Sequence, residues 1–172
     1  MQIIKYPPKE NWNEILSRPT KSMQDIEQIV LPILEDVKEN GDIALKKYSK
    51  QFDGIELNEL LVSTEEVAFA LTQITEELKE AIEVAYLNIF KFHQHQQTKI
   101  EVVETTEGVH CWRKSVGIEK VGLYIPGGTA PLFSTVLMLV IPAVIAGCKE
   151  IIICTPPNSE GKIHPAILYV AN

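Results

Sequence analysis

One stretch of the chain, residues 121–155, constrains the fold more than any other: VGLYIPGGTAPLFSTVLMLVIPAVIAGCKEIIICT. A short apolar run meets the breaking sequence Pro126-Gly127-Gly128, and an almost wholly apolar segment, Gly147 and three consecutive isoleucines follow. This order predicts a strand, a glycine turn, a helix and a second strand, which together make a βαβ unit. A strand that enters a helix through such a turn leaves free backbone N–H groups, where a phosphate or carboxylate can bind.

Before this unit the chain has mostly helical periodicity. Apolar residues recur every three or four positions in four segments between residues 22 and 93, which predicts four helices. Ser22 begins the first helix and Gly41 ends it, while Pro32 inside it should produce a kink. Asp42 caps the second helix, and Ser63 opens a capping box for the third.

The remaining segments predict an arm, a hairpin and one further helix. Residues 1–20 show little periodicity beyond a short helical turn around Trp12, so we interpret them as an arm. Alternating residues flank Thr-Glu-Gly at positions 106–108, a pattern typical of a β-hairpin. His164 precedes a helix with Pro165 at its first position. A parallel sheet of two strands lacks the neighbours that cover its faces, so the chain is expected to be part of a longer α/β protein.

The composition excludes several classes of function. A net charge of −7 argues against nucleic acid as the main partner, because a phosphate backbone requires clustered basic residues. Cys111, Cys148 and Cys154 form no CxxC pair, which indicates reduced thiols in a cytoplasmic protein. The N-terminal residues lack the apolar segment typical of a secretory signal, so none is expected. The most apolar window, residues 132–146, is shorter than the about 20 residues of a membrane span and contains Pro142, so no membrane partner is expected.

The turn at residues 126–131 is the best candidate for a ligand site. Its glycines let the backbone approach a ligand, and Tyr124 at the strand end can pack against a ring or a ribose. Thr129, Ser134 or Thr135 could add hydroxyl contacts. The alternative is a tight strand-to-helix connection that binds nothing. The turn is not GxGxxG, and no acidic residue follows the second strand, so spacing alone does not establish NAD binding.

The residues of this chain predict no metal site and no catalytic group. His93 and His95 are two positions apart, so on a helix they point to different sides. These histidines and His164 are expected to have surface or capping roles. Cys154, at the end of the second strand, is predicted to be a small buried core residue.

Two segments of the chain resemble the histidinol dehydrogenase family. The first is the run of residues 121–157 that contains VGLYIPGG, and the second is GDIALKKYSKQFD at residues 41–53. The second resembles the family's G-D-x-A-L-x-x-Y-S-x-x-F-D stretch. The order and spacing of the two also fit, so the resemblance covers essentially the whole chain but only the N-terminal portion of a family member.

The resemblance implies an enzyme that oxidises L-histidinol to L-histidine through L-histidinaldehyde, the last step of histidine biosynthesis. It implies NAD and zinc as cofactors and a homodimer as the assembly. Tyr124 matches the family tyrosine that contacts NAD, and Gly127, Gly128 and Thr129 lie beside it. The zinc ligands, the acid–base pair and the histidinol-binding residues of the family lie beyond Asn172, so this chain alone should be inactive.

The resemblance also predicts the domain organisation. Residues 1–20 correspond to the arm, 21–120 to the first part of one Rossmann-like domain, and 121–172 to the truncated start of a second, NAD-side Rossmann-like domain. The predicted fold is therefore α/β, with N-terminal helices and a β-hairpin followed by the first βαβ unit of an incomplete Rossmann-like domain. An alternative is a non-catalytic α/β interaction module from a truncated gene. A reading frame that continues past Asn172 would favour the enzyme.

Overall fold

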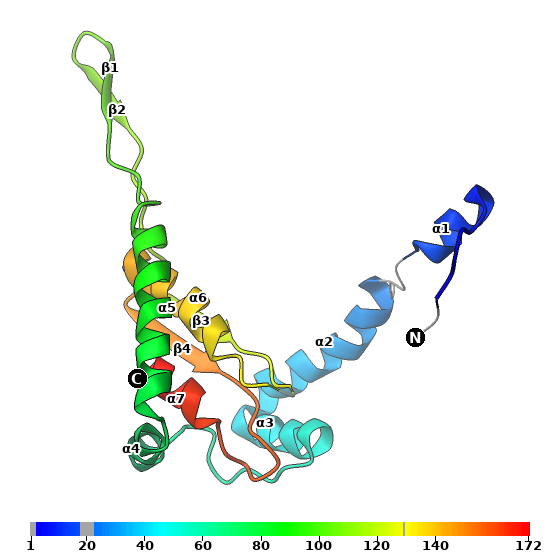
Figure 1. Cartoon of the computed structure of the whole chain (residues 1–172). Coiled ribbons are helices and arrows are strands. Elements are labelled where there is room, and N and C mark those ends of the chain that lie inside the picture. Colours follow the sequence, from blue (N-terminus) through cyan, green and yellow to red (C-terminus); the bar gives the residue numbers. More distant parts are fainter. Residues whose placement is uncertain (1–2, 18–22, 129) are drawn as a thin grey trace. The chain divides into compact units, whose positions relative to one another are not determined.

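The computed structural model describes residues 3–17, 23–128 and 130–172 (Figure 1). The chain divides into two units, Met1–Leu45 and Lys46–Asn172. The predicted boundary at residues 20 and 21 lies outside the described residues, as do Ser22 and Thr129. The division into an arm and two Rossmann-like domains stays a prediction for the complete protein.

The first unit is helical. A short 3₁₀ turn, η1 (Lys9–Asn11), leads into α1 (Trp12–Ile15), where the indole Nε1–H of Trp12 donates to the carbonyl of Pro7 at 3.1 Å. Helix α2 (Met23–Asn40) contains Pro32 and is followed by Gly41 at φ +53°, a backbone conformation that favours glycine. The predicted helix and its end at Gly41 are confirmed, while the kink at Pro32 stays a prediction.

Three helices follow, and side-chain oxygens cap two of them. Helix α3 (Asp42–Tyr48) continues into the π-helical turn η2 (Ser49–Asp53). Helix α4 (Thr64–Thr72) begins after Ser63, whose Oγ accepts the N–H of Glu66 at 3.1 Å. Helix α5 (Glu76–Gln94) begins in the same way after Thr75. Each cap satisfies a backbone donor that the first helical turn leaves without a partner. The N-cap at Ser63 is confirmed, while the reciprocal bond of a capping box stays a prediction.

The predicted β-hairpin is present. Strand β1 (Val102–Thr106) pairs antiparallel with β2 (Val109–Trp112). Gly108 occupies the turn at φ +78°, and its N–H donates to the Glu104 carboxylate at 2.8 Å. Every residue of both strands is exposed.

The βαβ unit follows the predicted order. Strand β3 (Lys120–Tyr124) and strand β4 (Glu150–Cys154) pair in parallel, with α6 (Phe133–Ala146) between them in the chain, and α7 (Pro165–Ala171) comes after β4. Two apolar clusters form the core: one contains Ile125, Val136 and Ile167, and the other joins Ile82 of α5 to Leu137 and Ile141 of α6. The expected incomplete α/β domain is confirmed.

The two-stranded sheet has one covered face. Val121, Leu123, Ile151 and Ile153 are half-buried, and Ile153 packs against the core cluster that contains Val136. The alternate residues Gly122, Tyr124, Ile152 and Cys154 are exposed. The prediction that Cys154 is buried is therefore wrong. Its position on the strand places it on the face that the described residues of this chain do not cover.

Candidate functional site

A cavity of about 170 Å³ lies where the carboxyl ends of β3 and β4 meet. Residues from the turn after β3 form one wall, between positions 126 and 132, and residues from the loop after β4 and the start of α7 form the other, between 155 and 167. This is the edge at which parallel α/β sheets bind ligands.

The turn after β3 is held close to the loop after β4. Ile125 is fully buried, and its N–H donates to the carbonyl of Cys154 at 2.8 Å, so the parallel ladder continues past the strand end. A β-carbon on Gly127 would lie 2.6 Å from Cγ of Pro156, so any other residue would force one of the two segments to shift. A β-carbon on Gly128 would meet no described atom within 4 Å. The close contact with Pro156 therefore explains why position 127 is a glycine. No such contact restricts position 128, which has open space beside the cavity.

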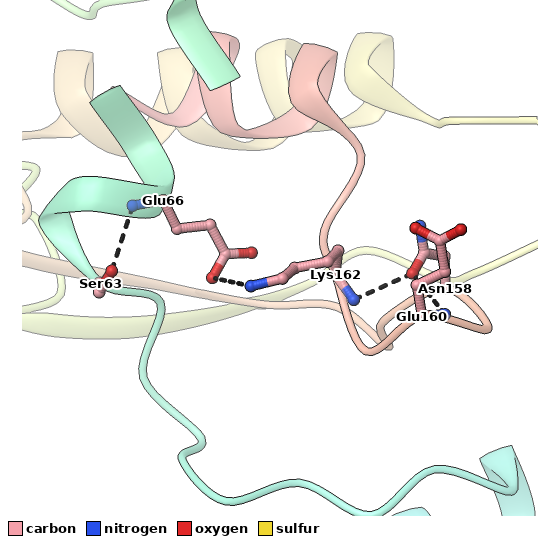
Figure 2. Close-up of polar contacts among 5 residues, drawn as sticks. All are labelled: Ser63, Glu66, Asn158, Glu160 and Lys162. Carbon is pink, nitrogen blue, oxygen red and sulfur yellow. Dashed lines mark hydrogen bonds and ion pairs between the residues drawn. The ribbon is translucent and has the colours of Figure 1, made fainter. Parts of the chain in front are cut away.

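The loop after β4 is closed by one asparagine (Figure 2). The side-chain Oδ1 of Asn158 accepts the N–H groups of Glu160 at 3.0 Å and Lys162 at 2.9 Å. The backbone N–H of Asn158 donates in turn to the carbonyl of Lys162 at 2.8 Å. Gly161, at φ +73°, allows the chain to reverse its direction within this loop. These bonds fix the backbone of Lys162 at the cavity.

An ion pair connects this loop with the start of α4. Oε2 of Glu66 lies 3.8 Å from Nζ of Lys162, and the backbone N–H of Glu66 donates to Ser63 (Figure 2). The Lys162 side chain is 62% exposed and that of Glu66 is 22% exposed. Exposed pairs of this kind contribute about 0–1 kcal/mol, so the pair is a weak restraint on the loop.

His164 completes the second wall and caps α7. Its Nδ1 accepts the N–H of Ala166 at 3.2 Å, so a neutral ring carries its proton on Nε2. His93 and His95 hydrogen-bond near the end of α5, to Gln96 and to the carbonyl of Lys91. The predicted capping role of His164 is confirmed, while the roles expected of His93 and His95 stay predictions.

The structure brings together only some of the predicted site residues. Gly127 and Gly128 line the cavity. Tyr124 ends β3 with its side chain 65% exposed on the uncovered face of the sheet, and it is not part of the cavity wall. Ser134 and Thr135 also lie outside that wall.

Sequence reasoning missed the second wall of the cavity. Pro156, Asn158 and Lys162 all follow β4, and each of them lines the cavity. A signal was available, because two parallel strands end at the same edge of a sheet and the residues after each strand then become neighbours.

The described residues do not fit a metal ion. Between positions 3 and 172, apart from the stretches that the structure does not describe, no group of three His, Cys, Asp or Glu side chains could hold one. In that same part of the chain, none of the helices is long and apolar enough to cross a bilayer.

Together, the parallel strands, the crossover helix and the cavity at the carboxyl edge define an incomplete α/β domain. The histidinol dehydrogenase family model matches residues 16–172. The chain belongs to the histidinol dehydrogenase family, as the sequence predicted.

Individual relatives give the same result. The histidinol dehydrogenase of Bacteroides thetaiotaomicron is 54% identical over 171 residues, which are 99% of this chain and 40% of that protein. The histidine biosynthesis trifunctional protein of Saccharomyces cerevisiae is 43% identical over 173 residues, 99% of this chain and 22% of its own length. The crystal structure of histidinol dehydrogenase from Elizabethkingia anophelis matches with a TM-score of 0.86 and 50% identity, over 96% of this chain and 38% of that one. The chain thus spans about 40% of the length of the bacterial relatives, in agreement with the expected N-terminal portion.

Proposed function

We propose that this chain is the N-terminal portion of a histidinol dehydrogenase that oxidises L-histidinol to L-histidine through L-histidinaldehyde, with NAD and zinc. The observation that carries the proposal is the match to the Elizabethkingia anophelis enzyme, which extends over 96% of this chain at 50% identity. Identity at this level along almost the whole chain supports a shared reaction as well as a shared fold.

In this proposal the chain provides part of the NAD site. When bound, NAD accepts the hydride that leaves the alcohol carbon. The turn at Gly127 and Gly128 lets the backbone approach the cofactor at the edge of the parallel sheet. Tyr124 is the last residue of β3 and is mostly exposed, which supports a packing contact with a ring or ribose of NAD. Thr129, between the turn and α6, is proposed to contribute to the same site.

We assign the chemical steps to residues beyond Asn172. The described residues offer no ligand set for zinc, so the metal, the acid–base groups and the histidinol-binding groups are proposed to come from the rest of the enzyme. We further propose that the complete enzyme is a cytoplasmic homodimer. Exposed apolar residues on α2, such as Leu31 and Leu34, support burial of this helix against other parts of the assembly.

The test compares the complete enzyme with the 172-residue chain, both produced in a host that lacks its own histidinol dehydrogenase. The complete enzyme is expected to form NADH when L-histidinol and zinc are supplied, and the 172-residue chain is expected to form none. Histidinol-dependent NADH from the short chain would refute the assignment of the catalytic groups. A folded complete enzyme that forms no NADH would refute the proposed function itself.

A further inference from the structure

The cavity between the two strand ends differs in charge from the rest of the chain. The chain contains 23 acidic residues and has a net charge of −7, yet none of the described residues that line this cavity is Asp or Glu. Lys162 is the charged side chain of the described lining, and His164 lies in the same wall. A concave surface with a lysine and without carboxylates favours an anionic ligand group.

The structure fixes the backbone of Lys162 and leaves its ammonium group in a long, largely exposed ion pair with Glu66. Asn158 holds the backbone of Lys162 from both sides, with its side chain and with its own N–H. The ammonium lies 3.8 Å from the Glu66 carboxylate, which is longer than a hydrogen bond. Because the side chain is 62% exposed and its stem is flexible, a phosphate with stronger charge can replace this partner.

We propose that Lys162 is the counter-charge for a phosphate group of the dinucleotide that binds at this cavity. The inference rests on the proposed function, since NAD is the ligand that carries the phosphates. Glu66 competes with the phosphate for the ammonium, and Asn158 holds the lysine at the cavity wall (Figure 2).

A purely structural role for the ion pair makes a different prediction. If the Glu66–Lys162 contact only ties α4 to the loop, Glu66→Gln and Lys162→Gln break the same contact and weaken cofactor binding alike. If Lys162 binds phosphate, Lys162→Gln weakens binding, while Glu66→Gln removes a competing charge and does not. A comparison of Lys162→Gln with Glu66→Gln therefore distinguishes phosphate binding from a purely structural role of the ion pair.

The experiment measures steady-state kinetics of the complete enzyme. Lys162→Gln is expected to raise the KM for NAD about fivefold to tenfold, the size expected for one charge-assisted contact, with kcat and the KM for L-histidinol unchanged. Lys162→Arg retains the positive charge, so its KM for NAD is expected to stay close to that of the wild type. Glu66→Gln is expected to lower the KM for NAD about twofold. The matched control is Lys149→Gln, which removes the same charge from an exposed lysine paired with Glu119 next to the opposite end of β4.

Competition by two fragments of the cofactor locates the contact. ADP is expected to inhibit the Lys162→Gln enzyme about fivefold to tenfold less strongly than the wild type, because it carries the diphosphate. Adenosine, which has no phosphate, is expected to inhibit both equally.

Two results would overturn the inference. One is a rise in the KM for NAD in both Lys162→Gln and Glu66→Gln, and the other is a Lys162→Gln enzyme that behaves like Lys149→Gln. If the wild-type enzyme does not oxidise L-histidinol, the proposed function fails instead. ADP and adenosine titrations by calorimetry then test the phosphate contact without any turnover.

Discussion

Gly127 and Pro156 approach so closely that a β-carbon on Gly127 would lie 2.6 Å from Cγ of the proline. Nonbonded carbon atoms are most stable at about 3.5–4.0 Å, so this contact has no room for a side chain. A proline ring cannot swing aside as a long side chain does. The two walls of the cavity therefore depend on glycine at position 127.

Replacement of Gly127 by alanine is expected to lower the free energy of unfolding by about 1–3 kcal/mol, the cost typical of overpacking. The physical reason is that one wall must shift to remove the overlap with Pro156. Urea unfolding of the wild-type protein and of the Gly127→Ala variant measures the difference in the free energy of unfolding. The matched control is Gly128→Ala, which should leave stability within about 0.5 kcal/mol of the wild type, because the new methyl group meets no described atom within 4 Å. Equal midpoints for Gly127→Ala and Gly128→Ala would contradict the proposed steric role.

Replacement of Tyr124 by alanine is expected to affect cofactor binding and not folding. The side chain is 65% exposed, so the unfolding free energy should change by less than about 0.5 kcal/mol. In the complete enzyme the KM for NAD should rise about fivefold, the size of one aromatic packing contact. Tyr124→Phe retains the ring, so its KM for NAD should stay near that of the wild type.

The control for Tyr124 is Ile152→Ala on the same uncovered face of the sheet, where the side chain is 60% exposed. It should leave the KM for NAD unchanged. If Ile152→Ala raises the KM as much as Tyr124→Ala does, the effect comes from the sheet face in general, and the specific role of Tyr124 is wrong.

The helix ends could be predicted from the sequence because they depend on neighbours in the chain. Ser63 caps α4 by bonding a residue three positions later, and Gly41 ends α2 through its own backbone conformation. His164 caps α7 through an N–H two positions away. Such interactions are specified within a few residues, so a local pattern is sufficient to find them.

The exposure of Cys154 and the second cavity wall could not be predicted from local patterns. Whether Cys154 is buried depends on which elements cover its face of the sheet, and its apolar neighbours in the sequence do not specify this. Lys162 reaches the cavity because β4 pairs in parallel with β3 and because Asn158 closes the loop that follows. The loop closure is local, but the pairing of β3 with β4 joins segments about 30 residues apart, and this pairing brings Lys162 to the cavity.

A second steric prediction concerns the segment that precedes β3. A β-carbon on Gly117 would overlap the backbone carbonyl oxygen of Ala146 at the end of α6, and a backbone atom cannot rotate away. Gly117→Ala should therefore lower the free energy of unfolding by about 2 kcal/mol or more. The control is Gly122→Ala within β3, where a β-carbon meets no atom within 4 Å in the described part of the chain. Urea midpoints that fall equally for both variants would refute the role of the Gly117–Ala146 contact.

The first turn of α4 predicts a pH-dependent contribution to stability from Glu65. Hydrogen bonds from its own backbone N–H, and then from the Ser63 and Thr64 side chains, hold the pKa of this carboxyl below its ordinary value of 4.5. A carboxyl whose pKa is lowered by folding stabilises the protein above its unfolded-state pKa, and this contribution is lost as the pH falls through the lowered pKa. Glu65→Gln should therefore be less stable than the wild type at neutral pH, and the two should converge in acid below that pKa. Urea midpoints across this range measure the difference, and a difference that stays constant with pH would show that ionisation of Glu65 contributes nothing.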